Sequence, residues 1–435
     1  MEYNFKTLNY LGSKLRLLNF IEDNVLRITN KGQGVCDLFA GSGCVSYKLS
    51  NHFSVTSCDI QSYSKSICNA LLKKHVVSEN DIDKFISDIQ VDHELFNCFD
   101  PLIITEEQAI KTKNLEVLSE ILENGSVEVF RLENKWSLLN NQLQKVSTNL
   151  NNTALLNEKS LISRYYGGVY FSYRQAVWID VILEEIHKNI SKENRDLYLA
   201  ALLSTASDIA DTVGKHFAQP IKSRDSNGNI KNTVYNKALK DKTIDVIKLY
   251  RNWLIRYIST PRTRYHFHTT QSDYLECLQN LPNSVKTIYA DPPYTRDHYS
   301  RYYHVLETIT LRDSPELSTT NIHGKRHISN GIYRKDRHQS PFCIKSKAPE
   351  TFKAMFKIIS NSGRNLLLSY SPYDESKKSH PRVVTMQQLL IWAKNYFNHV
   401  DVVSAGSFKH SKLNSIDHSL DASNEAEVLI VCTNE

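Results

Sequence analysis

The chain has 435 residues, of which 41% are hydrophobic and 23% are charged, and its formal net charge is +6. This composition is typical of a folded protein with two or three domains, so disorder is not the default interpretation. No apolar run approaches the ~18 residues that span a bilayer, and the N-terminal residues lack a basic and an apolar signal segment. We therefore expect a cytoplasmic protein without a membrane anchor.

Charge and cysteine placement narrow the class of partner further. Residues 221–268 contain eleven Lys or Arg against three Asp or Glu, whereas residues 75–161 contain seven against fifteen. This asymmetry favours a surface for a polyanion, with an unevenly charged solvated surface as the alternative. None of the eight cysteines forms a CxxC pair or a zinc-ligand cluster, so we expect no metal.

The first 74 residues predict alternating helices and strands. Apolar residues recur at steps of three and four from Lys14 to Ile28, which indicates an amphipathic helix. The predicted elements that follow are a strand at 35–39, a glycine turn at 40–43, a helix from 44, a strand at 53–58 and a helix at 62–74. A strand, glycine turn, helix and second strand ending in an acid are typical of a nucleotide-binding α/β sheet.

The alternation stops after residue 74 and resumes near residue 265. The intervening residues read mostly as helices, including the small-residue stretch 200–210. The later predicted strands are 266–270, 285–290, 365–370, 400–403 and 427–432. We therefore predict one discontinuous α/β domain, residues 1–74 and 265–435, with a mainly helical insertion at 75–264.

Two motifs in the first part predict a ligand site. The turn within Asp37-Leu-Phe-Ala-Gly-Ser-Gly43 lets the backbone approach a ligand closely, although an ordinary turn is the alternative. Asp59 ends the next strand, where a carboxylate can accept hydrogen bonds from ribose hydroxyls or cap the following helix.

The motif Asp291-Pro-Pro-Tyr294 carries the most chemistry. It follows the apolar strand 285–290, so it lies at the strand end where ligands bind in open α/β sheets. The Asp291 carboxylate and a main-chain carbonyl, expected to be that of Pro292, can accept both hydrogens of an exocyclic amine. Tyr294 offers a face on which an extruded base can stack. A stiff loop is the alternative.

These residues, in this order, resemble the Dam-like D12 class of adenine-N6 DNA methyltransferases. Asn9 to Lys14 looks like the class's N-terminal motif, Asp37 to Gly43 its cofactor loop, and Asp291 to Tyr294 its catalytic motif. The resemblance implies a Rossmann-like, S-adenosylmethionine-dependent methyltransferase sheet with the insertion as DNA target-recognition domain. The implied catalytic residues are Asp291, Pro292 and Tyr294. The implied cofactor-binding residues are Tyr10, Lys14, Asp37, Phe39, Gly41, Gly43, Asp59, Asp273 and Asp291, with core, surface or capping roles as alternatives for Tyr10, Lys14 and Asp273.

Two basic segments are candidates for double-stranded DNA contacts. Arginines alternate with aromatic residues near the end of the insertion, and a second basic segment follows the catalytic motif as a predicted loop. The candidate residues are Arg251, Arg256, Arg262, Arg264, Lys325, Arg326, Arg334 and Arg337. A solvated helix and a flexible surface loop are the alternatives.

The sequence favours a DNA adenine-N6 methyltransferase of a restriction-modification or phage-defence system over two rivals. An RNA adenine methyltransferase would share the cofactor motifs, and a non-catalytic cofactor-binding DNA protein would have a damaged catalytic motif. No convincing nuclease metal site is present, so we expect any restriction endonuclease partner to be a separate chain.

Overall fold

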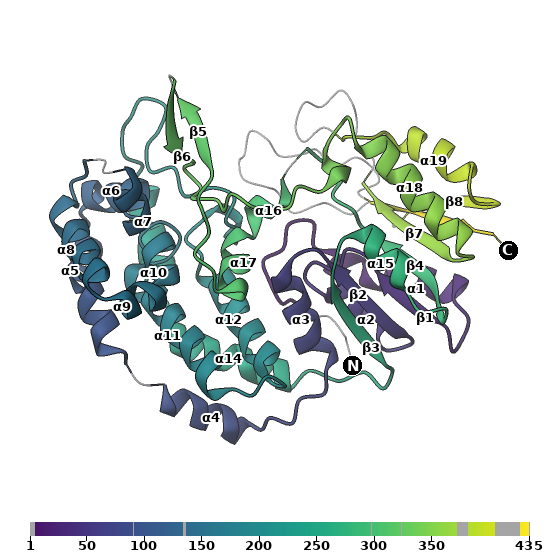
Figure 1. The fold of residues 1–435 in the computed structure, drawn as a ribbon, viewed down its shortest axis with the longest axis horizontal. Coiled ribbons are helices and arrows are strands. Elements are labelled where there is room, and N and C mark those ends of the chain that lie inside the picture. The colour runs from purple at the N-terminus through teal and green to yellow at the C-terminus, as the bar shows by residue number, and fades with distance from the viewer. Residues whose placement is uncertain are drawn as a thin grey trace. The chain divides into compact units, whose positions relative to one another are not determined.

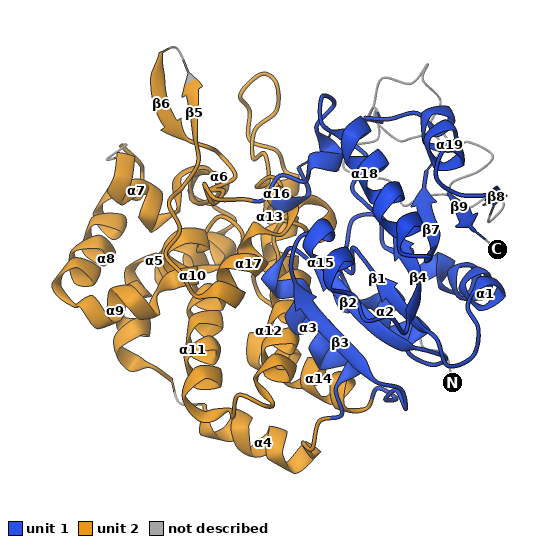
Figure 2. Ribbon diagram, turned by 45° about the vertical axis from the view of Figure 1, so that its right-hand side comes forward, with its two compact units in different colours: residues 1–74, 260–300, 338–435 blue, residues 75–259, 301–337 orange. Residues whose placement is uncertain are grey.

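The structure, a computed structural model, describes residues 5–89, 91–133, 136–296, 298–322, 324–371, 382–404 and 427–434. The chain divides into two compact units (Figures 1 and 2). The sheet unit is made of residues 1–74, 260–300 and 338–435, and the helical unit is made of residues 75–259 and 301–337. Residues 301–337 therefore differ from the sequence-based division, which grouped them with the sheet.

Hydrogen bonds explain this difference. The backbone N–H of Phe217 donates to the carbonyl of Tyr302 at 2.9 Å, and the His304 ring lies 3.2 Å from the Phe217 carbonyl. Arg262 instead donates to the carbonyls of Ala70 and Leu71, so the residues just after 259 pack within the sheet unit.

The sheet unit contains a seven-stranded mixed sheet in the order β3-β2-β1-β4-β7-β9-β8. The first five strands in this order are parallel, and β9 runs antiparallel to both of its neighbours. The strands are β1 (Gly34–Asp37), β2 (Ser54–Asp59), β3 (Phe267–Gln271), β4 (Val285–Ala290), β7 (Asn365–Tyr370), β8 (His399–Ser404) and β9 (Val428–Thr433). The predicted strands are confirmed within two residues at each end, and so is the α/β class.

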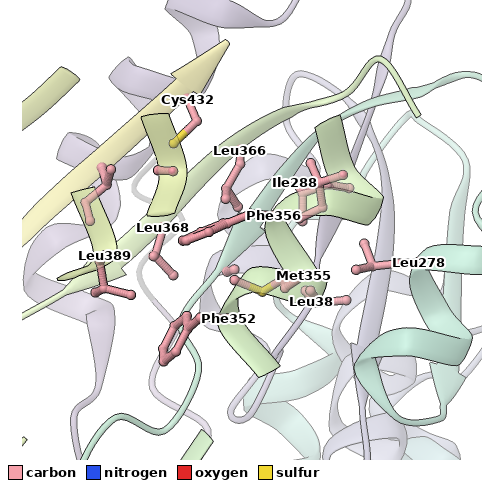
Figure 3. Close-up of a cluster of buried hydrophobic side chains, with 14 of the residues drawn as sticks. Leu38, Leu278, Ile288, Phe352, Met355, Phe356, Leu366, Leu368, Leu389 and Cys432 are labelled. Atoms are coloured by element: carbon pink, nitrogen blue, oxygen red, sulfur yellow. The ribbon is translucent and has the colours of Figure 1, made fainter. Parts of the chain in front are cut away.

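Helices cover both faces of this sheet because its central strands are apolar on both sides. Leu366 and Leu368 pack into one hydrophobic cluster while Leu367 packs into the other, as the two-residue period of a strand requires. Figure 3 shows the first cluster, where Phe352 and Phe356 pack near Leu366 and Leu368. The helices of the unit are η1 (Lys14–Leu17), α1 (Leu18–Ile28), α2 (Cys44–Leu49), α3 (Ser62–Leu72), α15 (Tyr274–Asn280), η3 (Pro341–Cys343), α18 (Ala348–Asn361) and α19 (Met386–Lys394). The short helix α16 (Tyr299–Tyr302) spans the boundary between the units.

The helical unit follows the prediction for residues 75–259 and adds a hairpin that was not predicted. Its helices are α4 (Glu79–Asp88), α5 (His93–Thr112), α6 (Leu115–Asn124), α7 (Val127–Glu133), α8 (Asn140–Asn152), α9 (Ala154–Lys159), α10 (Leu161–Tyr166), α11 (Tyr173–Asn189), α12 (Arg195–Ile209), η2 (Val213–Lys215), α13 (Thr233–Asp241), α14 (Val246–Ile258) and α17 (His304–Leu311). Strands β5 (Thr319–Ile322) and β6 (Lys325–Ile328) form an antiparallel pair where a loop was expected. None of the described helices has the length and apolar character needed to cross a bilayer.

Candidate active site

The turn after β1 requires glycine at two positions. Gly41 and Gly43 have φ values of +51° and +72°. A Cβ on Gly41 would lie 2.6 Å from the hydroxyl oxygen of Tyr10, and one on Gly43 would lie 3.1 Å from Cys68 Sγ. No other residue could therefore replace Gly41 without moving its neighbour. The structure brings Tyr10 and the glycine turn together, and a cofactor contact by Tyr10 stays a prediction.

Asp59 at the end of β2 is bound to the same turn. Its carboxylate accepts hydrogen bonds from the backbone N–H of Gly41 at 2.8 Å and from that of Gln61 at 2.9 Å. The first bond fixes the glycine turn against the end of the neighbouring strand. The second bond holds the start of α3, so the carboxylate joins the turn to the following helix.

Asp37, the last residue of β1, has one satisfied and one unsatisfied carboxylate oxygen. Its Oδ2 accepts from the Ser46 backbone N–H at 3.0 Å and from the Ser46 hydroxyl at 2.7 Å. Its Oδ1 is buried and has no hydrogen-bond partner among the described residues. Burial raises the pKa of Asp37 to about 7, although the bonds from Ser46 oppose this rise. A buried oxygen without a donor is costly, so a cationic or N–H-bearing ligand would stabilise it.

Asp291, directly after β4, forms a charged group with two other side chains. Its Oδ2 lies 3.0 Å from Lys14 Nζ, and its side chain is 23% exposed. Lys14 also forms an ion pair with Glu427, whose carboxylate accepts a hydrogen bond from the Ser369 hydroxyl. Lys14 and Glu427 are both buried. The structure therefore places a buried cation between two carboxylates, of which only Asp291 is partly open to solvent.

The pKa shifts of this group have opposing causes. Burial raises the pKa of Asp291 to about 6, while Lys14 lowers it and Glu427 raises it. Burial would lower the pKa of Lys14, but Asp291 and Glu427 together raise it well above its ordinary value. Lys14 therefore keeps its charge at ordinary pH, whereas the Asp291 carboxyl changes from protonated to ionised around its raised pKa of about 6.

The ring of Tyr294 is held by two residues from elsewhere in the sheet unit. The ring centroids of Tyr294 and Tyr370 are 4.9 Å apart, and the Arg382 guanidinium lies 4.8 Å from the Tyr294 centroid. The Tyr294 carbonyl accepts from the N–H of Val383 at 3.1 Å. These contacts fix the ring direction after the two prolines, of which Pro292 is buried.

Phe39 and Asp273 have identifiable structural contacts. The Phe39 ring meets Phe342 edge-on at 5.4 Å, so it packs against the core beside the turn. Asp273 accepts from the N–H groups of Leu275 at 2.8 Å and Glu276 at 3.1 Å, which is the helix-capping alternative. A cofactor contact by either residue stays a prediction.

The basic stretch before β3 is not one free cationic face. Arg251 forms ion pairs with Asp83 at 2.6 Å and Glu79 at 3.1 Å within the helical unit. Arg262 donates to two carbonyls of α3, as described above. The geometry therefore gives Arg251 and Arg262 structural partners, and their DNA contacts stay predictions. Arg256 lies 4.0 Å from the ring centroid of Trp253, and Arg264 is exposed.

The second basic segment contains both buried and exposed cations. Arg334 is 4% exposed and makes two hydrogen bonds to the Asp313 carboxylate, at 2.5 and 2.6 Å. Asp313 therefore occupies its guanidinium, and a DNA contact by Arg334 stays a prediction that this geometry does not favour. Arg337 donates to the Arg334 carbonyl at 2.5 Å and is only partly exposed. Lys325 and Arg326 are exposed on β6 and keep the predicted role open.

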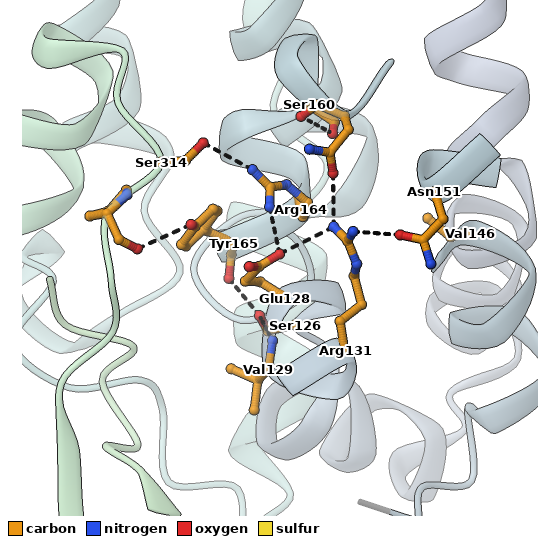
Figure 4. A network of polar contacts seen from close by, with 12 residues as sticks. Ser126, Glu128, Val129, Arg131, Val146, Asn151, Ser160, Arg164, Tyr165 and Ser314 are labelled. Carbon is orange, nitrogen blue, oxygen red and sulfur yellow. Dashed lines mark hydrogen bonds and ion pairs between the residues drawn. The ribbon is translucent and has the colours of Figure 1, made fainter. Parts of the chain in front are cut away.

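The β5–β6 hairpin is attached to a polar network in the helical unit. The N–H of Ile328 donates to the carboxylate of Glu133, the last residue of α7. On the same helix Glu128 pairs with Arg164 at 2.6 Å and with Arg131 at 3.4 Å (Figure 4). The Glu128–Arg164 pair connects α7 to α10 and so supports the base of the hairpin.

All eight cysteines pack in the protein interior as free thiols. Cys36 and Cys277 lie with their sulfur atoms 4.0 Å apart within the hydrophobic core. In the part of the chain that the structure describes, no group of three or more His, Cys, Asp and Glu side chains could hold a metal ion.

Sequence reasoning missed three residues of this site. Glu427 had only one signal, an acidic residue directly before an apolar strand, and nothing indicated Lys14 as its partner. Ser369 lies inside a strand that reads as uniformly apolar. Arg382 lies 88 positions after Tyr294 and has no local signal.

A family model and several curated proteins match this chain, and they point to one class of enzyme. Residues 10–101 match the D12 class N6 adenine-specific DNA methyltransferase family. The resemblance to the D12 class is confirmed. The matched D12 class segment contains Tyr10, Lys14, the glycine turn and Asp59, whereas Asp291 lies beyond it.

The curated relatives that match this chain are named as modification methylases or type II methyltransferases. The chain is 26% identical over 378 residues to modification methylase LlaI of Lactococcus lactis subsp. lactis, covering 85% of this chain and 47% of the relative. It is 22% identical over 371 residues to type II methyltransferase M.FokI of Planomicrobium okeanokoites, covering 84% and 44%. It is 24% identical over 361 residues to type II methyltransferase M.NlaIII of Neisseria lactamica, covering 80% of each. The chain thus spans about half the length of the first two relatives.

Proposed function

We propose that this chain is a site-specific DNA adenine-N6 methyltransferase that uses S-adenosylmethionine on a Rossmann-like sheet. We further propose that it is the modification component of a restriction-modification or phage-defence system. The observation that carries the proposal is the position of Asp291 directly beyond β4, next to the glycine turn beyond β1. These strands are neighbours, with Asp37 opposite Tyr289. Ligands bind beyond the carboxyl ends of the strands in open α/β sheets.

The side chains near the glycine turn fit S-adenosylmethionine. The unsatisfied Oδ1 of Asp37 would accept from the ligand's ammonium group, and Gly41 and Gly43 leave room for its backbone to approach. Asp59, at the end of the neighbouring strand, would accept hydrogen bonds from ribose hydroxyls. When bound, S-adenosylmethionine supplies an electrophilic methyl group on a sulfonium. Asp37, Asp291 and Glu427 outnumber the buried Lys14, which favours a ligand of net positive charge.

Asp291 and the Pro292 carbonyl have the chemistry to activate an adenine amine. The amine is a poor nucleophile because its lone pair is delocalised into the ring. A carboxylate and a carbonyl that accept its two hydrogens stabilise the positive charge that develops on nitrogen. Tyr294, fixed by Tyr370 and Arg382, would stack on the extruded base and hold the amine in line for direct displacement.

The helical unit is proposed as the target-recognition domain. Its β5–β6 hairpin carries the exposed Lys325 and Arg326 on a base that α7 supports. Positive side chains on such a hairpin suit phosphate contacts, which position a protein on the duplex without reading sequence. Arg256 and Arg337, whose side chains also pack on aromatic rings, and the exposed Arg264 remain proposed contacts.

Labelled methyl transfer tests this function. The chain is incubated with methyl-labelled S-adenosylmethionine and either genomic DNA or total RNA, and the product is digested to nucleosides. We expect the label in N6-methyldeoxyadenosine. Label in N4-methyldeoxycytidine, or in RNA alone, would show that the substrate is not DNA adenine. Cofactor binding without transfer to either would favour a non-catalytic DNA protein.

A further inference from the structure

Glu427 reaches the proposed active site because of the direction of its strand. β9 runs antiparallel to β7, so the residue before β9 lies beside the carboxyl end of β7, with Val428 opposite Tyr370. Glu427 is therefore brought to the same edge of the sheet as Asp291. It is 3% exposed, it pairs with Lys14, and it accepts from the Ser369 hydroxyl at the end of β7.

The contact between Lys14 and Asp291 poses a problem for the proposed chemistry. Lys14 Nζ lies 3.0 Å from Asp291 Oδ2. The charge of Lys14 therefore withdraws electron density from the carboxylate that must accept a hydrogen bond from the target amine. A carboxylate that is held by a cation is a weaker acceptor for a second donor. The second carboxylate on Lys14 counters this effect because it neutralises the lysine charge.

We infer, resting on the proposed function, that Glu427 is a positioning residue: it holds Lys14 and balances its charge so that Asp291 remains a strong acceptor for the adenine amine. Ser369 orients Glu427 from the adjacent strand. No contact between Glu427 and the substrate is required, since it acts through Lys14 and Asp291.

The charged and titratable groups around Asp291 predict the direction of the effect. Asp291 interacts with Lys14, Glu427, Asp37, Tyr289 and Tyr294. Burial and Glu427 raise the pKa of Asp291, whereas Lys14 lowers it. Removing the charge of Glu427 leaves Lys14 unopposed, so the pKa of Asp291 should fall and the carboxylate should become a weaker acceptor.

The variant Glu427→Gln tests this inference through two measurements, a titration of Asp291 and the pH profile of methyl transfer. In the cofactor-free protein, the carboxyl carbon of Asp291 is titrated by NMR and assigned by its loss in Asp291→Asn. We expect a lower midpoint in Glu427→Gln than in the wild type. In labelled transfer, the acidic limb of the pH profile should move to lower pH, kcat on the plateau should fall about tenfold, and KM for DNA should change less than about twofold.

Two further variants separate positioning from loss of stability. Thr287→Val removes a buried hydroxyl contact with Thr29, 2.7 Å long, in the same sheet without touching Lys14, and should leave the midpoint unchanged. Glu427→Asp keeps the charge but withdraws it from Lys14, and should shift the midpoint less, in the same direction; it replaces Glu427→Gln if that variant does not fold.

An unshifted midpoint in both Glu427 variants overturns the inference, and so does a kcat loss equal to that of Thr287→Val. If the wild type methylates no adenine, the proposed function fails and this inference fails with it. An active wild type with unaffected Glu427 variants removes the inference alone.

Discussion

The strand-end acids of the sheet unit and the arginines of the helical unit differ in how completely their charges are satisfied. Asp37 keeps a buried oxygen without a partner among the described residues, and Asp291 is partly open to solvent beside Lys14. Arg251 and Arg334, in contrast, are each paired with carboxylates of their own unit. A charged side chain with unused bonding capacity indicates a ligand, whereas a charge that is already paired indicates a structural contact.

Asp291→Ala removes one of the acids whose charge is not fully satisfied, and it should have the largest effect of the variants proposed. Removing the carboxylate leaves the adenine amine with one acceptor, so we expect kcat to fall at least about a thousandfold. The affinity for S-adenosylmethionine should weaken only modestly, because Asp37 and the glycine turn are unchanged. Single-turnover transfer and equilibrium cofactor binding measure the two quantities.

Asp291→Asn is the matched variant, since it keeps the shape and loses the charge. It should be nearly as inactive as Asp291→Ala. Retained turnover in either variant would remove Asp291 from the proposed chemistry.

Gly41→Ala tests whether the turn is shaped for a ligand. The added Cβ would meet the Tyr10 hydroxyl at 2.6 Å at a φ of +51°, so the turn or Tyr10 must move. We expect cofactor affinity to weaken about ten- to a hundredfold, from about 1–3 kcal/mol of strain. Equilibrium binding of S-adenosylmethionine measures this loss.

Gly363→Ala provides the control for backbone strain alone. Gly363 also has a positive φ, +63°, but no atom lies within 4 Å of its added Cβ. Gly363→Ala should lower the free energy of unfolding about as much as Gly41→Ala does, but it should bind the cofactor with wild-type affinity. Equal cofactor loss in both alanine variants would mean that the turn after β1 has no special role.

Strand direction explains how much of this site could be predicted from the sequence. Asp37 and Asp59 are the last residues of their strands and Asp291 directly follows its strand. All three strands are parallel, so the common edge of these acids follows from the strand pattern alone. Glu427 precedes its strand, and its place at that edge depends on β9 being antiparallel, which the apolar run does not reveal. Arg334 could not be distinguished from Lys325 by charge, since its partner Asp313 becomes visible only when the chain is folded. The β5–β6 hairpin was missed because its residues are polar and basic.

The exposed cations of the β5–β6 hairpin and the paired Arg334 together test the comparison on the helical unit. Replacing Lys325 and Arg326 together by Ala should weaken DNA binding about tenfold and lower the salt dependence of binding, because phosphate contacts release counterions. The melting temperature should stay unchanged. Arg334→Ala should do the opposite: it leaves Asp313 unpaired and destabilises the fold, with little change in the salt slope of the folded fraction. Weakened salt dependence in Arg334→Ala would show that Arg334 contacts DNA.

Asp37→Asn tests the cost of leaving one buried oxygen free. The pKa of Asp37 is raised from 3.8 in the unfolded chain to about 7 in the folded protein, so the folded state binds more protons between these values. Stability contributed by the protonated form is therefore present below about pH 4 and is lost as the pH rises through 7. At pH 8 the neutral Asn should make the cofactor-free protein more stable by about 1–3 kcal/mol, and this advantage should shrink toward pH 4. Urea unfolding at several pH values measures it, and a cofactor affinity that falls as stability rises would show that the strained oxygen is kept for its ligand.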